Sequence, residues 1–284
     1  MYSTLVVPLD GSVFSAQAIA PAVFLSTRTH AALSLLHVHE GAPNPTYRAP
    51  AWDEFFRAQD ETYLESIAER VQSEVTASVD WALLDGDVVA AICASVEAAA
   101  SPLVIMSTHG RTGIRRTWLG GVATGVLRHS SAPILMVRPH DENGAANLVS
   151  TDAPFAEVIV ALDGSPFAEQ VLPHAMGVAR ASNAHLTLLR SVDAAAGVDA
   201  TRDACAYLQS IASRTADGCP PADTRVEANR SPAAAILSIA SASVRPLVAM
   251  ASHGRGLSRL FLGSVADEVV RAIPGPVLMI RPRA

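Results

Sequence analysis

The chain has 284 residues, a formal net charge of −6 and a hydrophobic residue fraction of 50%. The negative charge argues against a protein whose whole surface binds nucleic acid, and no run approaches the ~18 apolar residues that a membrane span requires. The length suits two domains, each large enough to bury a core of its own.

The three cysteines, Cys93, Cys205 and Cys219, show neither CxxC nor Cys/His spacing. Their placement argues against a disulfide framework and against a zinc site. A strand-like run begins by Leu5, which leaves no room for the basic and apolar regions of a signal peptide. These features predict a cytoplasmic protein.

The first apolar run, Leu5–Leu9, has the continuous pattern of a strand that is covered on both faces. An Asp-Gly-Ser turn follows it, and then a helix through Ile19 and Val23 that is expected to kink at Pro21, as the corresponding helix of the second half is at Pro173. The later elements alternate in the same way, with strands at Leu33–Val38, Val79–Leu84, Leu103–Ser107 and Ile134–Val137, and helices at Asp53–Val75, Val88–Ala99 and Val122–Arg128.

The second half of the chain repeats this pattern. TLVVPLDGSVFSAQAIAPAV from Thr4 matches EVIVALDGSPFAEQVLPHAM from Glu157, and LSLLHVH from Leu33 matches LTLLRSV from Leu186. These matches make Asp10 equivalent to Asp163. The offset between the copies falls from 153 there to 144 at the two His-Gly pairs, so the second copy lacks nine residues in its middle.

Alternating strands and helices predict an α/β fold with two tandem, doubly wound, parallel five-stranded sheets of Rossmann-like type. We expect the first domain at residues 1–139, a linker at 140–154 and the second domain at 155–284. Ligands of such sheets bind beyond the carboxyl ends of the strands. Asp10 and His109, which follow the first and fourth strands, are therefore expected to line one crevice.

Each copy ends in a glycine- and arginine-rich loop that leads into a helix, within His109–Arg138 and His253–Arg281. Glycines let backbone N–H groups approach a phosphate, and the N-terminus of the following helix adds partial positive charge. No G-x-G-x-x-G follows the first strand, and no G-x4-G-K-S/T occurs, so a dinucleotide oxidoreductase and a P-loop NTPase are excluded at the motif level.

The strand-Asp-Gly-Ser start, the LSLLHV-type second strand, the His-Gly-Arg loop and the Leu-Gly…Pro-strand ending together resemble the universal stress protein family in its tandem form. The resemblance implies a nucleotide-binding fold of the adenine nucleotide alpha hydrolase type and a role in the stress response. It also implies a homodimer or an intramolecular pseudo-dimer built through the last strands. In one branch of the family it implies ATP binding without a dedicated catalytic apparatus.

The ATP-binding branch resembles G-x2-G-x9-G-S/T, and the first half matches this pattern in part. Ser107 stands at the first glycine, Gly110 and Gly120 match with nine residues between them, and Gly121 replaces the hydroxyl residue. Losing that hydroxyl removes about one hydrogen bond to phosphate. Arg111, Arg115 and Arg116 lie in the same loop and either contact phosphate or are merely solvated.

The second half departs from the pattern differently. Ala251 stands at the first glycine, Gly254 matches, only eight residues intervene, and Gly263 and Ser264 then match. A missing residue displaces the loop amides. Ser264 with Asp267 also resembles a capping box, which would occupy the helix end itself. The first half is therefore expected to be the better phosphate site.

For the ribose and the base, the resemblance points to Asp10 and Val38, matched by Asp163 and Ser191. An Asx turn or a helix cap is an equally good reading of Asp10. The residues predicted to bind nucleotide are Pro8, Asp10, Val38, Ser107, His109, Gly110, Arg111, Gly113, Gly120, Gly121, Val122, Asp163, Ser191, Gly254, Arg255, Gly263, Ser264 and Val265.

Asp85 and Asp87 are weak candidates for holding Mg²⁺ with a triphosphate. The second half has Asn229 and Ser231 there, so a turn and a helix cap are favoured for both halves. His109 and His253 have no evident nucleophile or base beside them and are interpreted as loop-stabilising residues.

The aromatic residues Trp52, Phe55 and Phe56 form either a lid or partner surface or ordinary helix packing, and ordinary helix packing is favoured. The leading hypothesis for the whole chain is a cytoplasmic stress-response regulator, not an enzyme, that binds ATP, with or without Mg²⁺, at least in its first half. The alternatives are a stress protein that binds no nucleotide and acts through an unknown protein partner, and a slow ATPase or self-phosphorylating protein. Neither a nucleic acid nor a membrane is expected as a partner.

Overall fold

A computed structural model describes residues 2–40, 50–108, 119–139, 152–215, 221–228, 231–252 and 262–282, without the side chains of residues 50 and 51. The chain forms two compact units, Met1–Asp152 and Ala153–Ala284. Most of the predicted linker at 140–154 lies outside the described residues.

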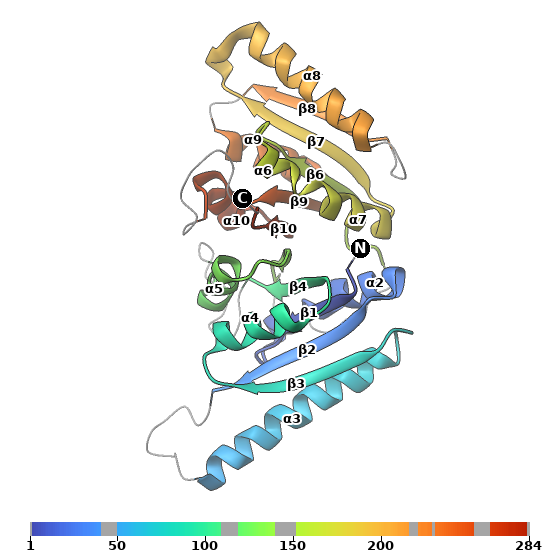
Figure 1. The fold of residues 1–284 in the computed structure, drawn as a ribbon, viewed down its shortest axis with the longest axis vertical. Helices are drawn as coiled ribbons and strands as arrows, with labels where there is room; N and C mark the ends of the chain where they lie inside the picture. The colour runs from blue at the N-terminus through green and yellow to red at the C-terminus, as the bar shows by residue number, and fades with distance from the viewer. Residues whose placement is uncertain are drawn as a thin grey trace. The chain divides into compact units, whose positions relative to one another are not determined.

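The first unit alternates strands and helices in the predicted order (Figure 1). Its elements are β1 (Thr4–Pro8), α1 (Val13–Ala16), α2 (Ile19–Thr29), β2 (Ala32–His39), α3 (Pro50–Gln72), β3 (Val79–Asp85), α4 (Val88–Ala98), β4 (Pro102–Ser107), α5 (Gly121–His129) and β5 (Ile134–Val137).

The second unit repeats this order. Its elements are β6 (Glu157–Ala161), α6 (Pro166–Glu169), α7 (Leu172–Ser182), β7 (His185–Val192), the short 3₁₀ helix η3 (Ala194–Ala196), α8 (Gly197–Thr215), β8 (Asp223–Ala228), α9 (Pro232–Ala242), β9 (Pro246–Ala251), α10 (Ser264–Ala272) and β10 (Val277–Ile280).

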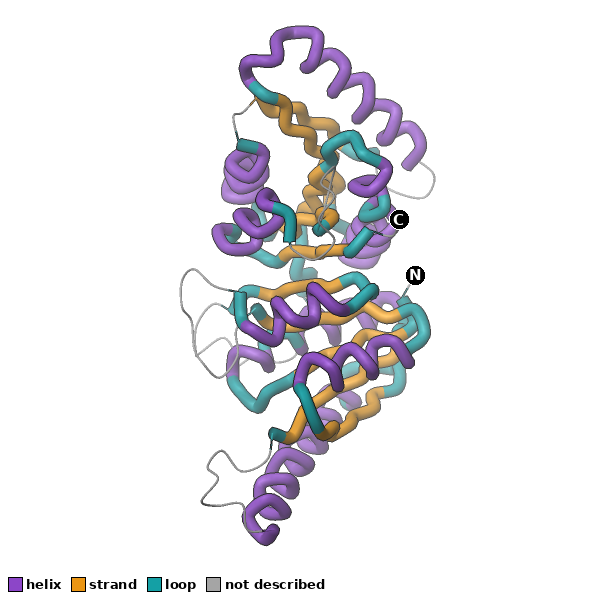
Figure 2. Tube along the Cα trace, turned by 60° about the vertical axis from the view of Figure 1, so that its left-hand side comes forward, coloured by secondary structure: helices purple, strands orange, loops and turns teal. Residues whose placement is uncertain are grey.

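Each unit contributes five strands that pair in parallel, in the order β3-β2-β1-β4-β5 and β10-β9-β6-β7-β8. The chain runs outward from β1 to β3 and then returns to the other side of β1, so the topological switch point lies between β1 and β4, and likewise between β6 and β9. Figure 2 shows the strands of each unit as one layer with helices packed against it. The predicted fold class is confirmed.

The central strands are buried on both faces, as their unbroken apolar sequence predicts. Val6 and Val7 of β1 point to opposite faces and are 1% and 0% exposed. The proline prediction is also confirmed, because the first helix of each unit is split into two pieces, α1–α2 and α6–α7, just before Pro21 and Pro173. Among the described residues, no helix has both the length and the hydropathy to cross a membrane.

Candidate functional site

A cavity of about 300 Å³ lies at the carboxyl ends of the strands of the first unit. The structure brings together here, from four separate segments, the seven predicted first-half residues that it describes. These are Pro8, Asp10, Val38, Ser107, Gly120, Gly121 and Val122. The remaining first-half candidates His109, Gly110, Arg111 and Gly113 lie outside the described residues, as do Arg115 and Arg116.

The corresponding cavity of the second unit is larger, about 810 Å³. The residues that line it include Asp163, Ser191, Gly263, Ser264 and Val265, which are the described second-half candidates. Gly254, Arg255 and His253 lie outside the described residues. The sequence comparison ranked the first half as the better nucleotide site, and that ranking stays a prediction.

Asp10 begins the turn that shapes one wall of the first cavity. Its Oδ1 accepts hydrogen bonds from the backbone N–H of Ser12 at 3.0 Å and from the Ser12 hydroxyl at 2.6 Å. Ser12 in turn caps α1 by accepting from the N–H of Ser15. The Asx-turn interpretation is thus confirmed, and the same carboxylate also lines the cavity, so the two readings of Asp10 are compatible.

The second unit repeats this turn with Asp163, whose Oδ1 accepts from the N–H of Ser165 at 2.8 Å. Gly164 has a φ of +85°, which a residue with a side chain rarely adopts. A Cβ added there would also lie 3.0 Å from Cζ of Arg190. The turn therefore requires the glycine, and a side chain there would also press on the arginine guanidinium that packs against it.

A glycine at the N-cap position starts the helix at the other wall of each cavity. The N–H of Gly120 donates to the carbonyl of Thr108 at 2.8 Å, and the N–H of Gly263 donates to that of Ser252 at 2.9 Å. Neither helix start has a side-chain cap. The amides of the first turn of α5 and of α10 are therefore not occupied by a capping side chain, as an anion site at a helix N-terminus requires.

The predicted capping box of Ser264 and Asp267 is wrong. Ser264 is the first helical residue of α10 rather than its N-cap, because Gly263 holds that position. The Asp267 carboxylate instead accepts a hydrogen bond from Nε of Arg271, one turn later, at 2.8 Å. This removes one of the reasons for which the second half was expected to be the poorer phosphate site.

Asp85 and Asp87 do not line the first cavity. The Asp85 carboxylate forms a two-point ion pair with Arg57, at 2.6 and 3.0 Å, and this hydrogen bonding holds the pKa of Asp85 below its usual range. Asp87 caps α4 by accepting from the N–H of Ala90, and Ser231 caps α9 in the same way. The cap interpretation is confirmed, and the described residues include no cluster of three or more His, Cys, Asp or Glu arranged to hold a metal.

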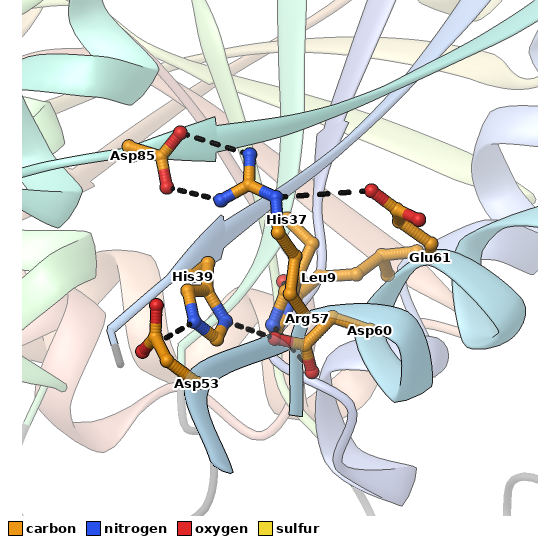
Figure 3. Close-up of polar contacts among 8 residues, drawn as sticks. All are labelled: Leu9, His37, His39, Asp53, Arg57, Asp60, Glu61 and Asp85. Atoms are coloured by element: carbon orange, nitrogen blue, oxygen red, sulfur yellow. Dashed lines mark hydrogen bonds and ion pairs between the residues drawn. The ribbon is translucent and has the colours of Figure 1, made fainter. Parts of the chain in front are cut away.

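Sequence reasoning missed a buried histidine cluster between β2 and α3 of the first unit (Figure 3). The Asp60 carboxylate lies between two imidazole rings, 2.7 Å from Nδ1 of His39 and 3.4 Å from Nε2 of His37. The other nitrogen of His39 faces Asp53 at 3.3 Å, and Nδ1 of His37 donates to the carbonyl of Leu9 at 2.7 Å. The spacing of the two histidines, i and i+2 on one strand, was the available signal.

Both ring nitrogens of His39 face carboxylates, which only accept hydrogen bonds when they are ionised. The side chain is buried, and burial alone lowers its pKa. The hydrogen bonds and charges of Asp60 and Asp53 outweigh that effect, so the pKa of His39 is raised above its ordinary value. With carboxylates facing both ring nitrogens, the cluster favours the protonated form of His39 and joins α3 to the end of β2.

In the second unit Arg190 takes the position of His37 and lines the larger cavity. Its Cζ lies 4.9 Å from the ring centroid of Tyr207 on α8. Arg190 was missed as well, although the aligned strands LSLLHV and LTLLRS already showed the exchange of histidine for arginine.

The aromatic residues at the start of α3 contact one another, with ring centroids 5.7 to 6.3 Å apart. Trp52 and Phe55 remain 47% and 50% exposed. They therefore pack on each other more than on the core. This arrangement does not fit the ordinary helix packing that the sequence favoured.

Comparison with known proteins agrees with this fold. The profile of the universal stress protein family matches residues 1–138 and, a second time, residues 154–281. A universal stress protein of Mycobacterium tuberculosis is 31% identical over 193 residues, which cover 63% of this chain and 61% of that relative. The match thus spans less than two thirds of that relative. A universal stress protein of Methanocaldococcus jannaschii is 25% identical over 142 residues, 49% of this chain and 83% of that protein.

A solved structure extends the likeness to the whole chain. The crystal structure of a universal stress protein from Archaeoglobus fulgidus has a TM-score of 0.78 with 20% identity and covers 99% of each chain. At that identity the likeness shows the fold alone.

Proposed function

The chain belongs to the universal stress protein family in tandem form, and from this premise we propose that it binds adenine nucleotide, ATP above all, as a regulatory protein of the cytoplasm. The observation that carries the proposal is the convergence of the predicted residues. Seven candidates that are scattered from Pro8 to Val122 in the sequence line a single cavity at the switch point of the sheet, where ligands of doubly wound folds bind.

The lining divides into a polar and an apolar part that suit the parts of a nucleotide. The Asp10 carboxylate retains acceptor capacity for ribose hydroxyls beside the turn that it holds. Val38 and Ile92 supply apolar walls for a base, and Gly120 and Gly121 bring uncapped helix amides toward a phosphate.

Binding without a dedicated catalytic apparatus fits a switch better than a metabolic enzyme. The two carboxylates considered for Mg²⁺ are engaged elsewhere, Asp85 by Arg57 and Asp87 by the start of α4. Nucleotide would act by engaging Gly120 and Gly121 at the start of α5, which changes the surface offered to a partner protein or to a second copy of the chain.

The exposed Trp52 and Phe55 favour a second candidate function, in which the chain acts through a protein partner without nucleotide. One experiment distinguishes this function from nucleotide binding. Purified full-length protein is denatured and the released small molecules are identified by mass spectrometry, and ATP with Mg²⁺ is then titrated calorimetrically into nucleotide-free protein.

We expect binding to wild type, a weaker first site in Asp10→Asn and a weaker second site in Asp163→Asn. Asp87→Asn is the matched control, since Asp87 caps α4 and does not line the cavity. Absence of ATP binding to the wild type would overturn the proposal. An equal loss of affinity in the control would show that the carboxylate effects are not specific to the cavity.

A further inference from the structure

One wall of the second cavity carries polar groups that have no partner within the described protein. Neither the guanidinium of Arg190 nor the carboxylate of Asp203 forms a hydrogen bond or ion pair with another described residue, and both line the cavity. Beside them, the buried hydroxyl of Ser191 has no hydrogen-bond partner among those residues either. A buried hydroxyl is costly to leave unpaired, so Ser191 points to a ligand, and the half-buried Arg190 and the exposed Asp203 line the same cavity.

Arg190 is held in place by its surroundings rather than by a carboxylate. Its guanidinium packs on the ring of Tyr207 and against Gly164. The Tyr207 hydroxyl donates to Glu169 at 3.1 Å, and Glu169 is also paired with Arg214 at 2.8 Å. Burial and the negative charge of Glu169 raise the pKa of Tyr207, which keeps its ring neutral. A guanidinium stacked in this way keeps its in-plane N–H donors available for a planar partner.

Asp203 supplies the complementary group. It precedes Tyr207 by one helical turn on α8, so the two side chains share a face of that helix. The cavity is lined by that face through Ala200 and Asp203. The base end of the second cavity therefore offers a two-point donor and an acceptor-only carboxylate from two different elements.

The first unit lacks this arrangement. A common offset of 144 aligns the buried Leu64 and Leu208 and also places Tyr63 opposite Tyr207. There the residue equivalent to Arg190 is His37, whose Nδ1 donates to the carbonyl of Leu9. No described residue of α3 lines the first cavity, so the added polar wall belongs to the second unit.

Guanine and adenine differ at the edges that such groups would contact. Guanine presents O6 and N7 as two acceptors, which match an arginine, and carries the amino group N2 as a donor for a carboxylate. Adenine has the donor N6 in place of O6, which a guanidinium cannot satisfy. We propose that the second cavity binds a guanine nucleotide in preference to an adenine nucleotide, with Arg190 contacting O6 and N7 and Asp203 contacting the donor edge.

This inference rests on the proposed nucleotide-binding function, since Asp163 and the Gly263–Ser264 helix start serve ribose and phosphate as their counterparts do in the first unit. It assigns the two halves of the chain to different bases. The full-length protein with Asp10→Asn, which weakens the first site, is titrated calorimetrically with GTP and with ATP in the presence of Mg²⁺.

We expect GTP to bind at least about fivefold more tightly than ATP, since one good two-point contact discriminates by roughly that factor or more. Arg190→His, which restores the residue of the first unit, should abolish the preference. With Arg190 and Asp203 unchanged, 7-deaza-GTP should bind more weakly than GTP because it lacks N7. ITP should also bind more weakly than GTP because it lacks the amino group. Asp203→Asn should remove the difference between GTP and ITP. Asp199→Asn is the control, because Asp199 pairs with Arg202 and does not line the cavity.

Equal affinity for GTP and ATP at this site, or a preference that survives Arg190→His, would overturn the inference and leave nucleotide binding itself standing. Failure of every nucleotide to bind either unit would instead overturn the proposed function. The base analogues are tested without altering Arg190 or Asp203, so the inference stays falsifiable even if those variants do not fold.

Discussion

The two units share a sheet order, an Asp-Gly-Ser turn and a glycine-led helix, but they differ beside the ends of their second strands. In the first unit that space holds His37, His39 and Asp60, and the cavity measures about 300 Å³. In the second it holds Arg190 and Tyr207, and the cavity measures about 810 Å³. The strands and turns that define the fold are thus separable from the side chains that define the ligand.

The difference has a physical origin in one strand position. A histidine at position 37 reaches both a backbone carbonyl and a carboxylate of the covering helix, which draws α3 onto the strand end. An arginine at position 190 finds an aromatic ring instead and keeps its donors for the cavity. The same fold therefore has a smaller cavity beside the polar cluster of the first unit and a larger cavity in the second unit.

The largest effect should come from the cores of the two units, which we expect to be equivalent and independent. Leu103→Ala and Leu247→Ala remove fully buried side chains at matched positions of β4 and β9. Each should cost about 2–5 kcal/mol of its own unit's unfolding free energy. Hydrogen exchange followed by mass spectrometry would show protection lost in the altered unit. Loss of protection spread equally over both units would contradict their independence.

Removing the carboxylate of the histidine cluster should be the next largest effect, and it should be confined to the first unit. Asp60→Asn replaces the shared carboxylate by a neutral amide with one acceptor oxygen, which can serve only one of the two buried imidazoles, and it should cost about 1–3 kcal/mol. Tryptophan fluorescence during urea unfolding reports on this unit alone, since Trp52, Trp81 and Trp118 all belong to it. Glu61→Gln, at an exposed neighbouring position, should change the midpoint little.

Gly164→Ala tests the turn of the second unit, where Arg190 packs against this glycine. The left-handed φ of Gly164 should make a side chain cost about 1–2 kcal/mol, and the new Cβ would also displace Arg190. Gly197→Ala is the matched control, because Gly197 has a similar φ of +80° with open space around it. Nucleotide affinity of the second site should fall for Gly164→Ala and not for Gly197→Ala. An equal fall in both would exclude the contact with Arg190 as its cause.

The helix caps should give smaller effects of equal size in both units. Asp87→Ala and Ser231→Ala remove the hydrogen bonds to Ala90 and Ala234, and each should cost about 1 kcal/mol. Thermal unfolding monitored by circular dichroism measures both. Loss of ATP binding in Asp87→Ala would revive the magnesium reading of that carboxylate.

The pH dependence of the first unit should be the smallest effect, because it reports only the difference between two protonation states. The pKa of His39 is raised in the folded protein above its unfolded value of about 6.5. The stability that protonated His39 contributes is therefore fully present below the unfolded pKa and is lost as the pH rises through the folded pKa. Urea midpoints from tryptophan fluorescence should fall as the pH rises above about 6.5, and Asp60→Asn should flatten the profile. A wild-type profile that is already flat there would contradict a protonated His39.

Much of the fold could be predicted because its determinants are local. Continuous apolar runs such as Leu5–Leu9 mark buried strands, and a twofold repeat of the same order fixes two equivalent sheets. Asp10 could also be named, since it follows a strand and parallel strands end at one edge, whereas Val38 and Gly120 were named from the family resemblance. The capping box failed because a single residue of register decides whether a serine is the N-cap or the first helical residue.

The sequence by itself determined the fold class, the repeat and the edge of each sheet at which a ligand would bind, because strand periodicity and turn residues act over a few neighbours. Only the tertiary structure decided what stands beside the second strands. His37 with Asp60 and Arg190 with Tyr207 are pairs that lie far apart in the chain, and they meet only because a helix returns across the sheet. The separate identities of the two sites follow from those long-range contacts.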